Sequence, residues 1–348
     1  MEKVSCRGEM NILSVAFPLF PVGADAGGGA EQILYLLERE LVHAGHHSIV
    51  IAARGSQVSG CLVETPPAPG KITDEVQNWA RSEHRKAIET ALNKRHIDFI
   101  HFHGLDFYEY VPAAPIPKLA TLHLPVEWYP KSIFDLPNVE LNFVSKTQAA
   151  KLAGRVVCNG IDVTHYEHDF RKEGYLLVLS RICPEKGTDI GLRVAHRLNL
   201  PMTIAGPVHA FEAHQRYFVE QVQPLLDAKR RYTGPAEFET KKHLLGKARC
   251  LLIPSLAPET SSLVAMEAMA AGTPVVAFRS GALPEVVEDG VTGFLVNTEE
   301  EMAEAVRHVD LISPKACRDW AQARFTTHRM AADYLALYRE LTLAGASQ

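Results

Sequence analysis

Short apolar segments alternate with amphipathic helical segments along the whole chain, and this alternation restricts the fold more than any other sequence feature. Strand-like runs that are apolar throughout indicate a parallel sheet covered by helices on both faces. The chain has 348 residues, which exceeds what one ordinary hydrophobic core accommodates. The sequence therefore predicts an α/β protein in which two Rossmann-like domains face each other across a cleft.

The expected elements follow from the positions of the apolar runs and of the helical periodicity. In the first half, the expected strands are residues 11–17, 47–53, 97–104, 118–123 and 139–145, and the expected helices are residues 30–45 and 74–95. In the second half, the expected strands are residues 175–180, 201–206, 230–234, 250–255, 274–278 and 293–296. One expected helix begins at Thr188, a second and long one ends at about Asp227, a third covers 241–249, and a fourth runs through Glu267 to Gly272.

The interruptions of this pattern suggest the domain boundaries. Residues 158–173 are polar and weakly periodic, which is typical of a linker between domains at 10–157 and 174–326. The tail, 327–348, predicts one amphipathic helix, whose apolar stripe comprises Met330, Tyr334, Leu337, Tyr338 and Leu341.

Two segments fall outside the pattern. Met1–Glu9 is expected to be an extension ahead of the first strand. The proline-containing segment Ser56–Gly70 is expected to be an irregular surface loop.

Charge, hydropathy and cysteine usage exclude several classes of function. The net charge is −5 and neither half has an excess of Lys and Arg, which argues against nucleic acid as a partner. No apolar run reaches the length of a membrane span, although contact with a membrane surface stays open. The N-terminus lacks the layout of a signal peptide. Six cysteines stand singly along the chain, which favours reduced thiols and a cytoplasmic protein.

The loop after the first strand contains three consecutive glycines, Gly27, Gly28 and Gly29, directly before a helix. Exposed backbone N–H groups and the helix dipole favour an anion at such a place, although a flexible turn has the same composition. The loop is not the dinucleotide fingerprint, and the second strand is not followed by an acidic residue that could bind a ribose. Both observations argue against a dehydrogenase.

The loop after the first strand of the second domain reads SRICPEKGTD. Arg181 and Lys186 flank a proline, and both come at the carboxyl end of a strand, where α/β sheets bind ligands. An arginine binds phosphate oxygens through two parallel hydrogen bonds, and a lysine adds a mobile positive charge. The pattern indicates a phosphate site, with two solvated surface cations as the alternative.

A helix that follows the strand CLLIPS contains a glutamate among small and apolar residues. Hydroxyls of Thr260–Ser262 are suited to cap its N-terminus. Glu267 lies about 7–8 Å along the helix axis from that end, roughly the offset between a diphosphate and the ribose of one nucleotide. We therefore predict that Glu267 binds a ribose, or otherwise a neighbouring Arg or Lys. Glu259, in the loop, would face the group beyond the diphosphate or simply be solvated.

Histidines are frequent, with 16 in the chain, but their spacing does not indicate a metal centre. His101 and His103 share one face of an expected strand, and His123 ends another. Neither a helical H-x-x-x-H pair nor a cysteine partner accompanies them. We expect no metal site, and a neutral histidine at a strand end can hydrogen-bond a sugar hydroxyl or cap the sheet.

The combined motifs resemble a known family. The segments SRICPEKG, PETSSLVAMEAMAAGTPVVAF and GALPEVVEDGVTGFLV are similar to the second domain of the retaining glycosyltransferases of family 4, which have the GT-B fold. Glu259 and Glu267 match the E-x7-E motif of that family. The likeness extends over nearly the whole chain through AGGGAE, DFIHFHGL, TLHLP and VCNGID.

The resemblance implies a role for each candidate residue. Arg181 and Lys186 would bind the donor diphosphate and stabilise it as the leaving group. Glu267 would hold the ribose, Glu259 would contact the transferred sugar, and the backbone amides of Ser262 and Leu263 would meet the phosphate or the sugar. In the first domain, the loop Gly27–Gly29 would close over the diphosphate and His123 would touch a sugar hydroxyl. The last helix would cross back to the first domain.

The implied reaction is transfer of a hexose from a nucleoside-diphosphate sugar, most readily a UDP-sugar, to an acceptor hydroxyl with retention. No metal or other cofactor is expected, because Arg181 and Lys186 supply the positive charge. The acceptor, whether a sugar, a lipid-linked group or another small molecule, is not readable from the sequence. A nucleotide-sugar 2-epimerase and a non-catalytic nucleotide-sugar binder are the alternatives, and conversion of the donor without an acceptor would separate them.

One departure from the family pattern affects the donor. Family members often read E-G-F-G-L where this chain reads Glu259-Thr260-Ser261-Ser262-Leu263. The second glycine of that pattern is replaced by Ser262, which places a side chain near the donor sugar and obscures which sugar fits. After His123, the segment VEWYP can shape an acceptor site or be a packed loop.

Overall fold

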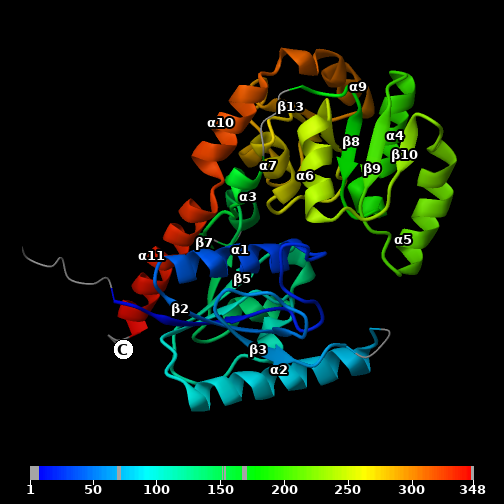
Figure 1. Ribbon diagram of the computed structural model, residues 1–348. Coiled ribbons are helices and arrows are strands. Elements are labelled where there is room, and N and C mark those ends of the chain that lie inside the picture. The colour runs from blue at the N-terminus through cyan, green and yellow to red at the C-terminus, as the bar shows by residue number, and fades with distance from the viewer. Residues whose placement is uncertain (1–7, 69–71, 151, 153, 167–170, 346–348) are drawn as a thin grey trace, which may run out of the picture. The chain divides into compact units, whose positions relative to one another are not determined.

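The computed structural model describes residues 8–68, 72–150, 152, 154–166 and 171–345 (Figure 1). By contacts along the chain it divides into two compact units. Unit 1 comprises residues 1–144, 149–159 and 327–348, and unit 2 comprises residues 145–148 and 160–326. Residues 1–7 of the expected extension and 167–170 of the expected linker lie outside the described residues.

Unit 1 contains a parallel sheet with the strand order β3-β2-β1-β4-β5-β6-β7 in the described residues. Its strands are β1 Asn11–Val15, β2 His47–Ala53, β3 Cys61–Thr65, β4 Phe99–Phe102, β5 Lys118–Leu122, β6 Glu140–Phe143 and β7 Arg155–Val156. Its helices are α1 Gly29–His43, α2 Asp74–Lys94 and α11 Thr327–Gly345, with 3-10 turns at Phe107–Glu109, Val126–Trp128 and Lys131–Asp135. Helix α3, Lys146–Ala149, lies at the boundary of the two units.

Alternating side chains of unit 1 pack on opposite faces of its sheet, as a pleated strand requires. In β2, Ile49 and Ile51 belong to the core that includes Ile88 of α2. Val50 and Ala52 pack on the other face, against Leu34 of α1. The sheet is therefore buried on both faces, which explains why its strands are apolar throughout.

The expectation of an irregular loop over Ser56–Gly70 was wrong, because the segment contains β3. This strand pairs in parallel with β2, with Ile49 opposite Cys61 and Ala53 opposite Thr65. The buried carboxylate of Glu38 accepts hydrogen bonds from the amides of Ser59 and Gly60 at 2.6 Å each, which holds the start of the strand. The prolines that suggested a loop follow the strand, where they interrupt no pairing.

Unit 2 contains a second parallel sheet, with the order β10-β9-β8-β11-β12-β13 in the described residues. The strands are β8 Leu176–Leu179, β9 Met202–Ala205, β10 Arg230–Tyr232, β11 Cys250–Ile253, β12 Val275–Phe278 and β13 Gly293–Val296. The helices are α4 Thr188–Arg197, α5 Glu212–Tyr217, α6 Phe238–Lys247, α7 Leu263–Ala270, α8 Leu283–Val286, α9 Glu299–His308 and α10 Pro314–Arg324. Short 3-10 turns cover Val163–His165, Pro184–Lys186, Gln223–Leu225 and Val309–Leu311.

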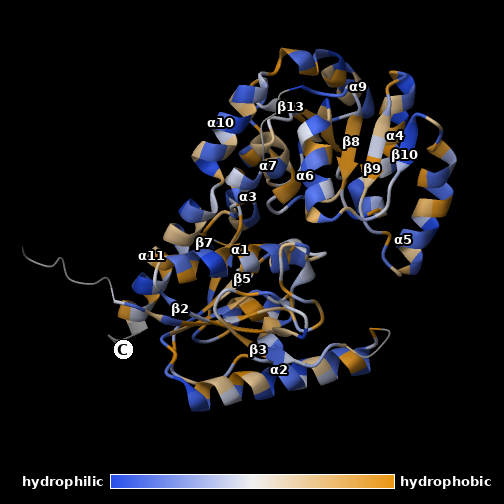
Figure 2. Cartoon of the chain, viewed as in Figure 1, coloured by the Kyte–Doolittle hydropathy of each residue, from blue (hydrophilic) through white to orange (hydrophobic). Residues whose placement is uncertain are grey.

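Helices cover both faces of the unit 2 sheet. Leu176 and Val178 of β8 pack in a core with residues of α4 and α9, whereas Leu177 packs on the opposite face with residues of α6, α7 and α10. Figure 2 shows β8 in the hydrophobic colour, while the helices carry both colours. A sheet enclosed in this way leaves its strand ends as the places where polar groups gather.

The helix that was expected to end near Asp227 changes its winding along its length. It begins as α5, continues as a π-helical turn at Phe218–Val222 and ends as a 3-10 turn at Gln223–Leu225. Pro224, which lacks a backbone N–H, lies in this last turn. The segment is thus helical, but it is not one regular α-helix.

Both units place their first strand inside the sheet and reverse the strand order beside it. In unit 1 the reversal falls between β1 and β4, and in unit 2 between β8 and β11. Loops that leave two such neighbouring strands at their carboxyl ends run in opposite directions and leave a crevice where α/β proteins bind ligands. The loops after β8 and β11 carry Lys186 and Glu259, so the fold places these two residues where a ligand-binding crevice is expected.

Candidate functional site

The loop after β8 turns tightly against the loop after β11. Pro184–Lys186 form a 3-10 turn, and Gly187 follows in the left-handed region with φ of 61°. A Cβ atom on Gly187 would lie 2.3 Å from the carbonyl oxygen of Pro254. The amide of Leu256 also donates a hydrogen bond of 2.8 Å to the carbonyl of Glu185. Glycine is therefore required at position 187 for the two loops to approach.

This approach joins two of the predicted site residues. The Nζ atom of Lys186 lies 2.5 Å from Oε1 of Glu259, and the hydroxyl of Ser255 donates to the same oxygen at 2.5 Å. The side chains of Lys186 and Glu259 are 24% and 11% exposed. The pair is thus largely shielded from water but still open on one edge, as a ligand-binding group has to be.

The backbone of Glu259 is fixed by a second close contact. Gly281, with φ of 55°, packs so closely that a Cβ atom there would lie 2.1 Å from the carbonyl oxygen of Glu259. The amide of Ala282 donates a hydrogen bond of 2.7 Å to that oxygen. Glu259 is therefore held by both its main chain and its side chain.

Arg181 is available for an anion. Its side chain is half-buried, and within the residues that the structure describes its guanidinium forms no ion pair or hydrogen bond. Its charge acts on the carboxylate of Glu185 in the same loop without a salt-bridge contact. A partly shielded arginine of this kind is suited to bind phosphate. Together with Lys186, it gives the loop after β8 the positive charge that the sequence predicted.

Helix α7 begins one residue after the loop that carries Glu259. Ser262 occupies its N-cap position, but no side-chain hydrogen bond caps the helix, contrary to the expected capping by Thr260–Ser262. Ser262 has φ of 58° and ψ of 70°, a left-handed conformation instead of the extended one that a capping residue usually has. The end of α7 follows the prediction, because Gly272 takes a φ of 69° directly after the helix.

Glu267 has a protein partner, which answers why a carboxylate is tolerated in an apolar helix. Nζ of Lys241, on α6, lies 2.7 Å from its Oε1 atom, and the two side chains are only 13% and 8% exposed. Burial, together with the neighbouring Glu267 carboxylate, raises the pKa of Tyr166 well above its usual value. The salt bridge was one of the two alternatives considered for Glu267, and the binding of ribose stays a prediction.

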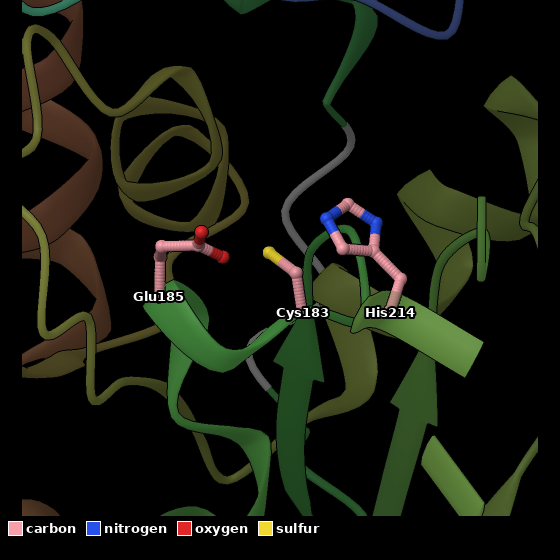
Figure 3. Close-up of side chains that lie close together, drawn as sticks. All are labelled: Cys183, Glu185 and His214. Carbon is pink, nitrogen blue, oxygen red and sulfur yellow. The ribbon is translucent and has the colours of Figure 1, made fainter. Parts of the chain in front are cut away.

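A cluster that sequence reasoning missed lies beside the same loop (Figure 3). Cys183, Glu185 and His214 each offer one potential ligand atom, and these atoms lie within 4.8 Å of one another. Nδ1 of His214 is buried without a hydrogen-bond partner in the described residues. Burial and the Glu185 carboxylate raise the pKa of the Cys183 thiol to about 11, so the neutral thiol predominates unless a metal displaces the proton. The sequence does not reveal this cluster, because His214, on α5, follows Cys183 by 31 positions.

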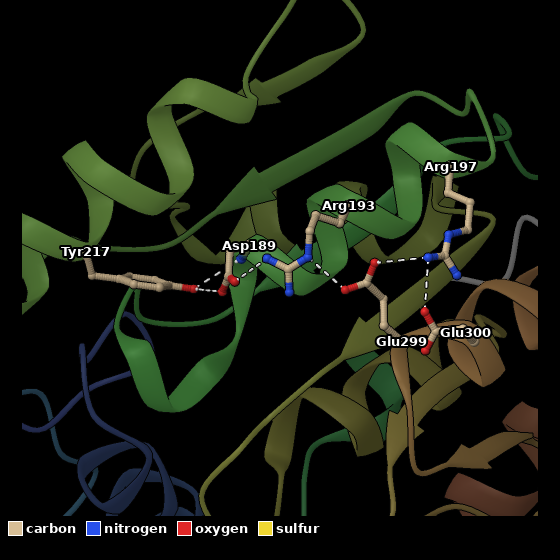
Figure 4. Close-up of polar contacts among 6 residues, drawn as sticks. All are labelled: Asp189, Arg193, Arg197, Tyr217, Glu299 and Glu300. Carbon is tan, nitrogen blue, oxygen red and sulfur yellow. Dashed lines mark hydrogen bonds and ion pairs between the residues drawn. The ribbon is translucent and has the colours of Figure 1, made fainter.

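The helix that follows this loop is anchored by a chain of polar contacts (Figure 4). Asp189, in the first turn of α4, accepts a hydrogen bond of 2.5 Å from the hydroxyl of Tyr217 and pairs with Arg193 at 2.6 Å. Arg193 in turn pairs with Glu299 of α9 at 2.7 Å. Arg197 extends the chain to Glu300 at 3.0 Å. Each exposed pair adds little alone, but together they connect α4 to its neighbours on both sides.

In unit 1, the glycine-rich loop has a partner that the sequence analysis did not consider. Gly28 is the N-cap of α1, and a Cβ atom there would lie 2.0 Å from Oε2 of Glu31. Glu31 is only 6% exposed, and burial raises the pKa of its carboxyl. Gly28 thus leaves room for the chain's own carboxylate, which lies at the positive end of the α1 dipole and which a larger residue at position 28 would have to displace.

The three predicted histidines of unit 1 form one polar column. His103 Nδ1 lies 3.1 Å from His123 Nε2, and the rings of His101 and His103 are 3.9 Å apart. His101 bonds the hydroxyl of Tyr338 at 2.7 Å and that of Thr121 at 2.8 Å. The sequence placed Tyr338 only in an apolar stripe. The structure shows that its hydroxyl satisfies a buried imidazole.

The three histidines, together with His84, which is buried on α2, predict that unit 1 loses stability in acid. Burial lowers the pKa of His84 and of His123 to about 4, and lowers that of His101 and His103 well below 6.5. The unfolded chain therefore binds more protons below pH 6.5, so stability is fully present above that pH and is lost as the pH falls towards 4. For His84 and His123 we expect a cost on the order of 1–2 kcal/mol each at pH 5.

Thermal unfolding between pH 7.5 and 5 checks this prediction. His84→Phe should flatten the pH dependence of the melting temperature. His328→Gln is the control, because the side chain of His328 is 91% exposed. A melting profile of His84→Phe that falls with acid as steeply as that of the wild type would contradict the assignment.

The structure thus brings Lys186 and Glu259 into contact, and places Arg181 in the loop after β8 and Ser262 and Leu263 at the start of α7. Glu267 lies further along α7, on Lys241. Gly27–Gly29 and His123 belong to unit 1. None of the described helices is long and apolar enough to cross a membrane.

Two α/β units of this topology fit the GT-B class of glycosyltransferase folds. Comparison with known families agrees. Residues 27–166 match the family described as Glycosyltransferase Family 4, and residues 173–309 match the one described as Glycosyl transferases group 1. The chain belongs to the family 4 glycosyltransferases.

The curated relatives support the same assignment over part of their length. The D-inositol 3-phosphate glycosyltransferase of Saccharomonospora viridis is 30% identical over 226 residues, which covers 56% of this chain and 52% of that protein. The enzyme of the same name from Mycobacterium tuberculosis is 35% identical over 142 residues, which covers 39% and 29%. The chain therefore matches about half or less of the length of these relatives.

Solved structures match the whole fold. Sucrose-phosphate synthase from Thermosynechococcus elongatus superimposes with a TM-score of 0.80 at 19% identity, covering 96% of this chain and 100% of that one. AviGT4, a glycosyltransferase involved in avilamycin A biosynthesis, gives 0.75 at 22%, covering 96% and 98%. HepE from Anabaena in complex with UDP-glucose gives 0.72 at 17%, covering 98% and 100%. At these identities the similarity shows the fold.

Proposed function

We propose that the chain transfers a hexose from a nucleoside-diphosphate sugar to an acceptor hydroxyl, with retention and without a metal. The observation that carries the proposal is the contact of Lys186 with Glu259 where the strand order of unit 2 reverses, beside the unpaired cation of Arg181. Such a pair offers a positive group for a diphosphate and an acceptor of hydrogen bonds for sugar hydroxyls. Family membership supports the same reaction.

In this proposal the positive side chains act on the leaving group. Arg181 and Lys186 bind the diphosphate and offset the charge that develops as the bond between the anomeric carbon and the phosphate oxygen breaks. The acceptor oxygen forms the new bond on the same face of the sugar, and its proton passes to the leaving phosphate. Because two cations already serve the diphosphate, we propose that no metal is needed.

The remaining residues orient the donor. We propose that Glu259 contacts the hexose and that Glu267 binds the ribose, in exchange for or beside Lys241. The amides of Ser262 and Leu263 lie in the first turn of α7, where backbone N–H groups lack partners within the helix, and are proposed to meet the phosphate or the sugar. Gly27–Gly29 are proposed to contact the diphosphate, and His123 a sugar hydroxyl.

The nucleotide and the location are finer points of the same proposal. UDP is the first base to test, because HepE was solved with UDP-glucose and the pneumococcal GtfA with UDP and GlcNAc. We also propose a cytoplasmic location, where reduced thiols persist. Cys61, Cys158, Cys183, Cys250 and Cys317 are all free thiols.

A thermal-shift series tests the donor and the metal together. The protein is melted with UDP, GDP, ADP and dTDP, and with the sugar nucleotides of the best base, in magnesium and in EDTA. At 100 times its Kd a ligand adds about 2.7 kcal/mol, which for a domain of this size raises the melting temperature by roughly 5–10 °C. We expect one base to give this shift equally in EDTA. No shift with any of the nucleotides would refute the proposed site.

The same series decides whether the Cys183 cluster acts as a metal site. If EDTA weakens the shift in the wild type and His214→Asn removes this sensitivity, the proposal of a metal-independent site is wrong. Conversion of the donor in the absence of any acceptor would instead identify an epimerase. Release of the nucleoside diphosphate only when a hydroxyl acceptor is added is the result that we expect.

A further inference from the structure

The backbone of Ser262 has a conformation that serine rarely adopts. Among the described residues, those other than glycine with a positive φ are Asn138, Asn199 and Ser262. Asparagine is enriched in the left-handed region because its short side chain bonds locally to the backbone. Serine has less of this compensation, and Ser262 is in addition 92% buried, since only 8% of its surface is exposed. Its conformation is therefore strained.

The side chains at this point are also unsatisfied. The hydroxyl oxygens of Ser261 and Ser262 are buried and have no hydrogen-bond partner in the described part of the chain. Ser261 is only 4% exposed. A buried hydroxyl without a partner loses its hydrogen bonds to water and gains nothing in return. A glycine at position 262 would remove both the strain and one of the unpaired hydroxyls.

Strain of this kind persists in proteins where a ligand makes use of it. Ser262 follows Glu259 by three residues and begins α7, whose first amides lack partners within the helix. A ligand that binds at the start of α7 would supply the hydrogen-bond partner that the Ser262 hydroxyl lacks.

We propose that the hydroxyl of Ser262 is a specificity-determining group that hydrogen-bonds a hydroxyl of the donor's hexose. The inference deepens the proposed function and rests on it. Ser262 narrows the space that glycine would leave at the start of α7 and adds a donor and an acceptor of hydrogen bonds. The preceding residue, Ser261, also has a buried hydroxyl without a partner in the described residues.

The test separates the hydroxyl from the backbone conformation. Ser262→Gly removes the side chain and the strain, whereas Ser262→Ala removes only the hydroxyl. Asn199→Gly is the matched control, because Asn199 has φ of 52° and is exposed at the end of α4, in the same unit. Calorimetric titration with UDP, UDP-glucose, GDP and GDP-mannose gives the Kd values, and melting without ligand gives the stability.

We expect Ser262→Gly to melt about 2–6 °C higher than the wild type, yet to bind the preferred sugar nucleotide roughly tenfold more weakly. Its Kd for the free nucleoside diphosphate should change less than twofold. Ser262→Ala should show the same loss of affinity with a smaller gain in stability than Ser262→Gly, because it removes the unpaired hydroxyl but keeps the strained backbone. Asn199→Gly should leave every Kd unchanged.

Two results would overturn the inference while leaving the proposed function intact. One is an unchanged Kd of Ser262→Gly for the sugar nucleotide. The other is an equal loss for the sugar nucleotide and the free diphosphate, since the phosphate and not the hexose would then contact Ser262. Wild-type protein that gives no thermal shift with UDP, GDP, ADP or dTDP would overturn the proposed function, and this inference with it.

Discussion

Replacing Lys186 by alanine is expected to reduce transfer by a factor on the order of 10²–10³ and to weaken nucleotide binding, because the proposed diphosphate site loses one of its two cations. The change also leaves Glu259, which is 11% exposed, with Ser255 as its remaining partner at Oε1. A carboxylate that is mostly buried and has lost its cation destabilises the fold. We therefore expect the free energy of unfolding to fall as well, by about 1–3 kcal/mol.

Initial rates with the donor identified by thermal shift, together with melting curves, check both effects. Lys186→Arg keeps the charge and should retain part of the activity. Lys315→Ala is the control for loss of an ion pair, because Lys315 and Asp319 are 74% and 57% exposed. Wild-type affinity for the nucleotide in Lys186→Ala would show that the diphosphate does not bind at the loop after β8.

Replacing Lys241 by methionine is expected to give the largest loss of stability among the changes considered. Lys241 and Glu267 are 13% and 8% exposed, so the variant leaves an almost fully buried carboxylate without its cation. We expect a loss of about 2–4 kcal/mol, equivalent to a fall in melting temperature of roughly 5–15 °C. Lys242→Met is a matched control on the same helix, since its partner Glu239 is 81% exposed.

A double variant measures the coupling of the pair. In Lys241→Met with Glu267→Leu, both charges are absent, and most of the lost stability should return. Nucleotide affinity separates the two roles of Glu267, because the double variant should fold well and still bind the nucleotide weakly if Glu267 contacts the ribose. A Lys241→Met variant that melts like Lys242→Met would show that the pair contributes little.

The sequence predicted the strands that carry the site better than the contacts within it. Lys186 and Glu259 were each identified because they follow apolar strands. Their contact depends on β8 lying beside β11, and strand order is not encoded in a local pattern. Glu267 was predicted to bind either a ribose or a basic residue, but Lys241 lies 26 positions earlier, and only the packing of α6 on α7 selects it.

Other features were missed for separate physical reasons. Strand β3 was overlooked because prolines that follow it were taken as part of the same loop. Glu31 was accessible to sequence reasoning, since a glutamate three residues after the N-cap commonly turns back towards the start of the helix. The left-handed φ of Ser262 could not be predicted, because a serine in a loop does not indicate which backbone conformation it adopts. The departure from the family's glycine was the only signal there.

Because Lys186 and Glu259 neutralise each other, we expect the proposed donor site to bind tightly only a ligand that interacts with both residues. An inorganic anion such as phosphate or sulfate offers Lys186 a partner but removes the cation from the Glu259 carboxylate. The cost of separating the ion pair then offsets much of the favourable interaction between Lys186 and the anion. A neutral sugar can hydrogen-bond only the Glu259 carboxylate and leaves Lys186 without a partner, so we expect it to bind weakly as well. We expect a molecule that joins a diphosphate to a polyhydroxylated ring to satisfy both residues at once, so the proposed site should favour a sugar nucleotide over simple phosphates.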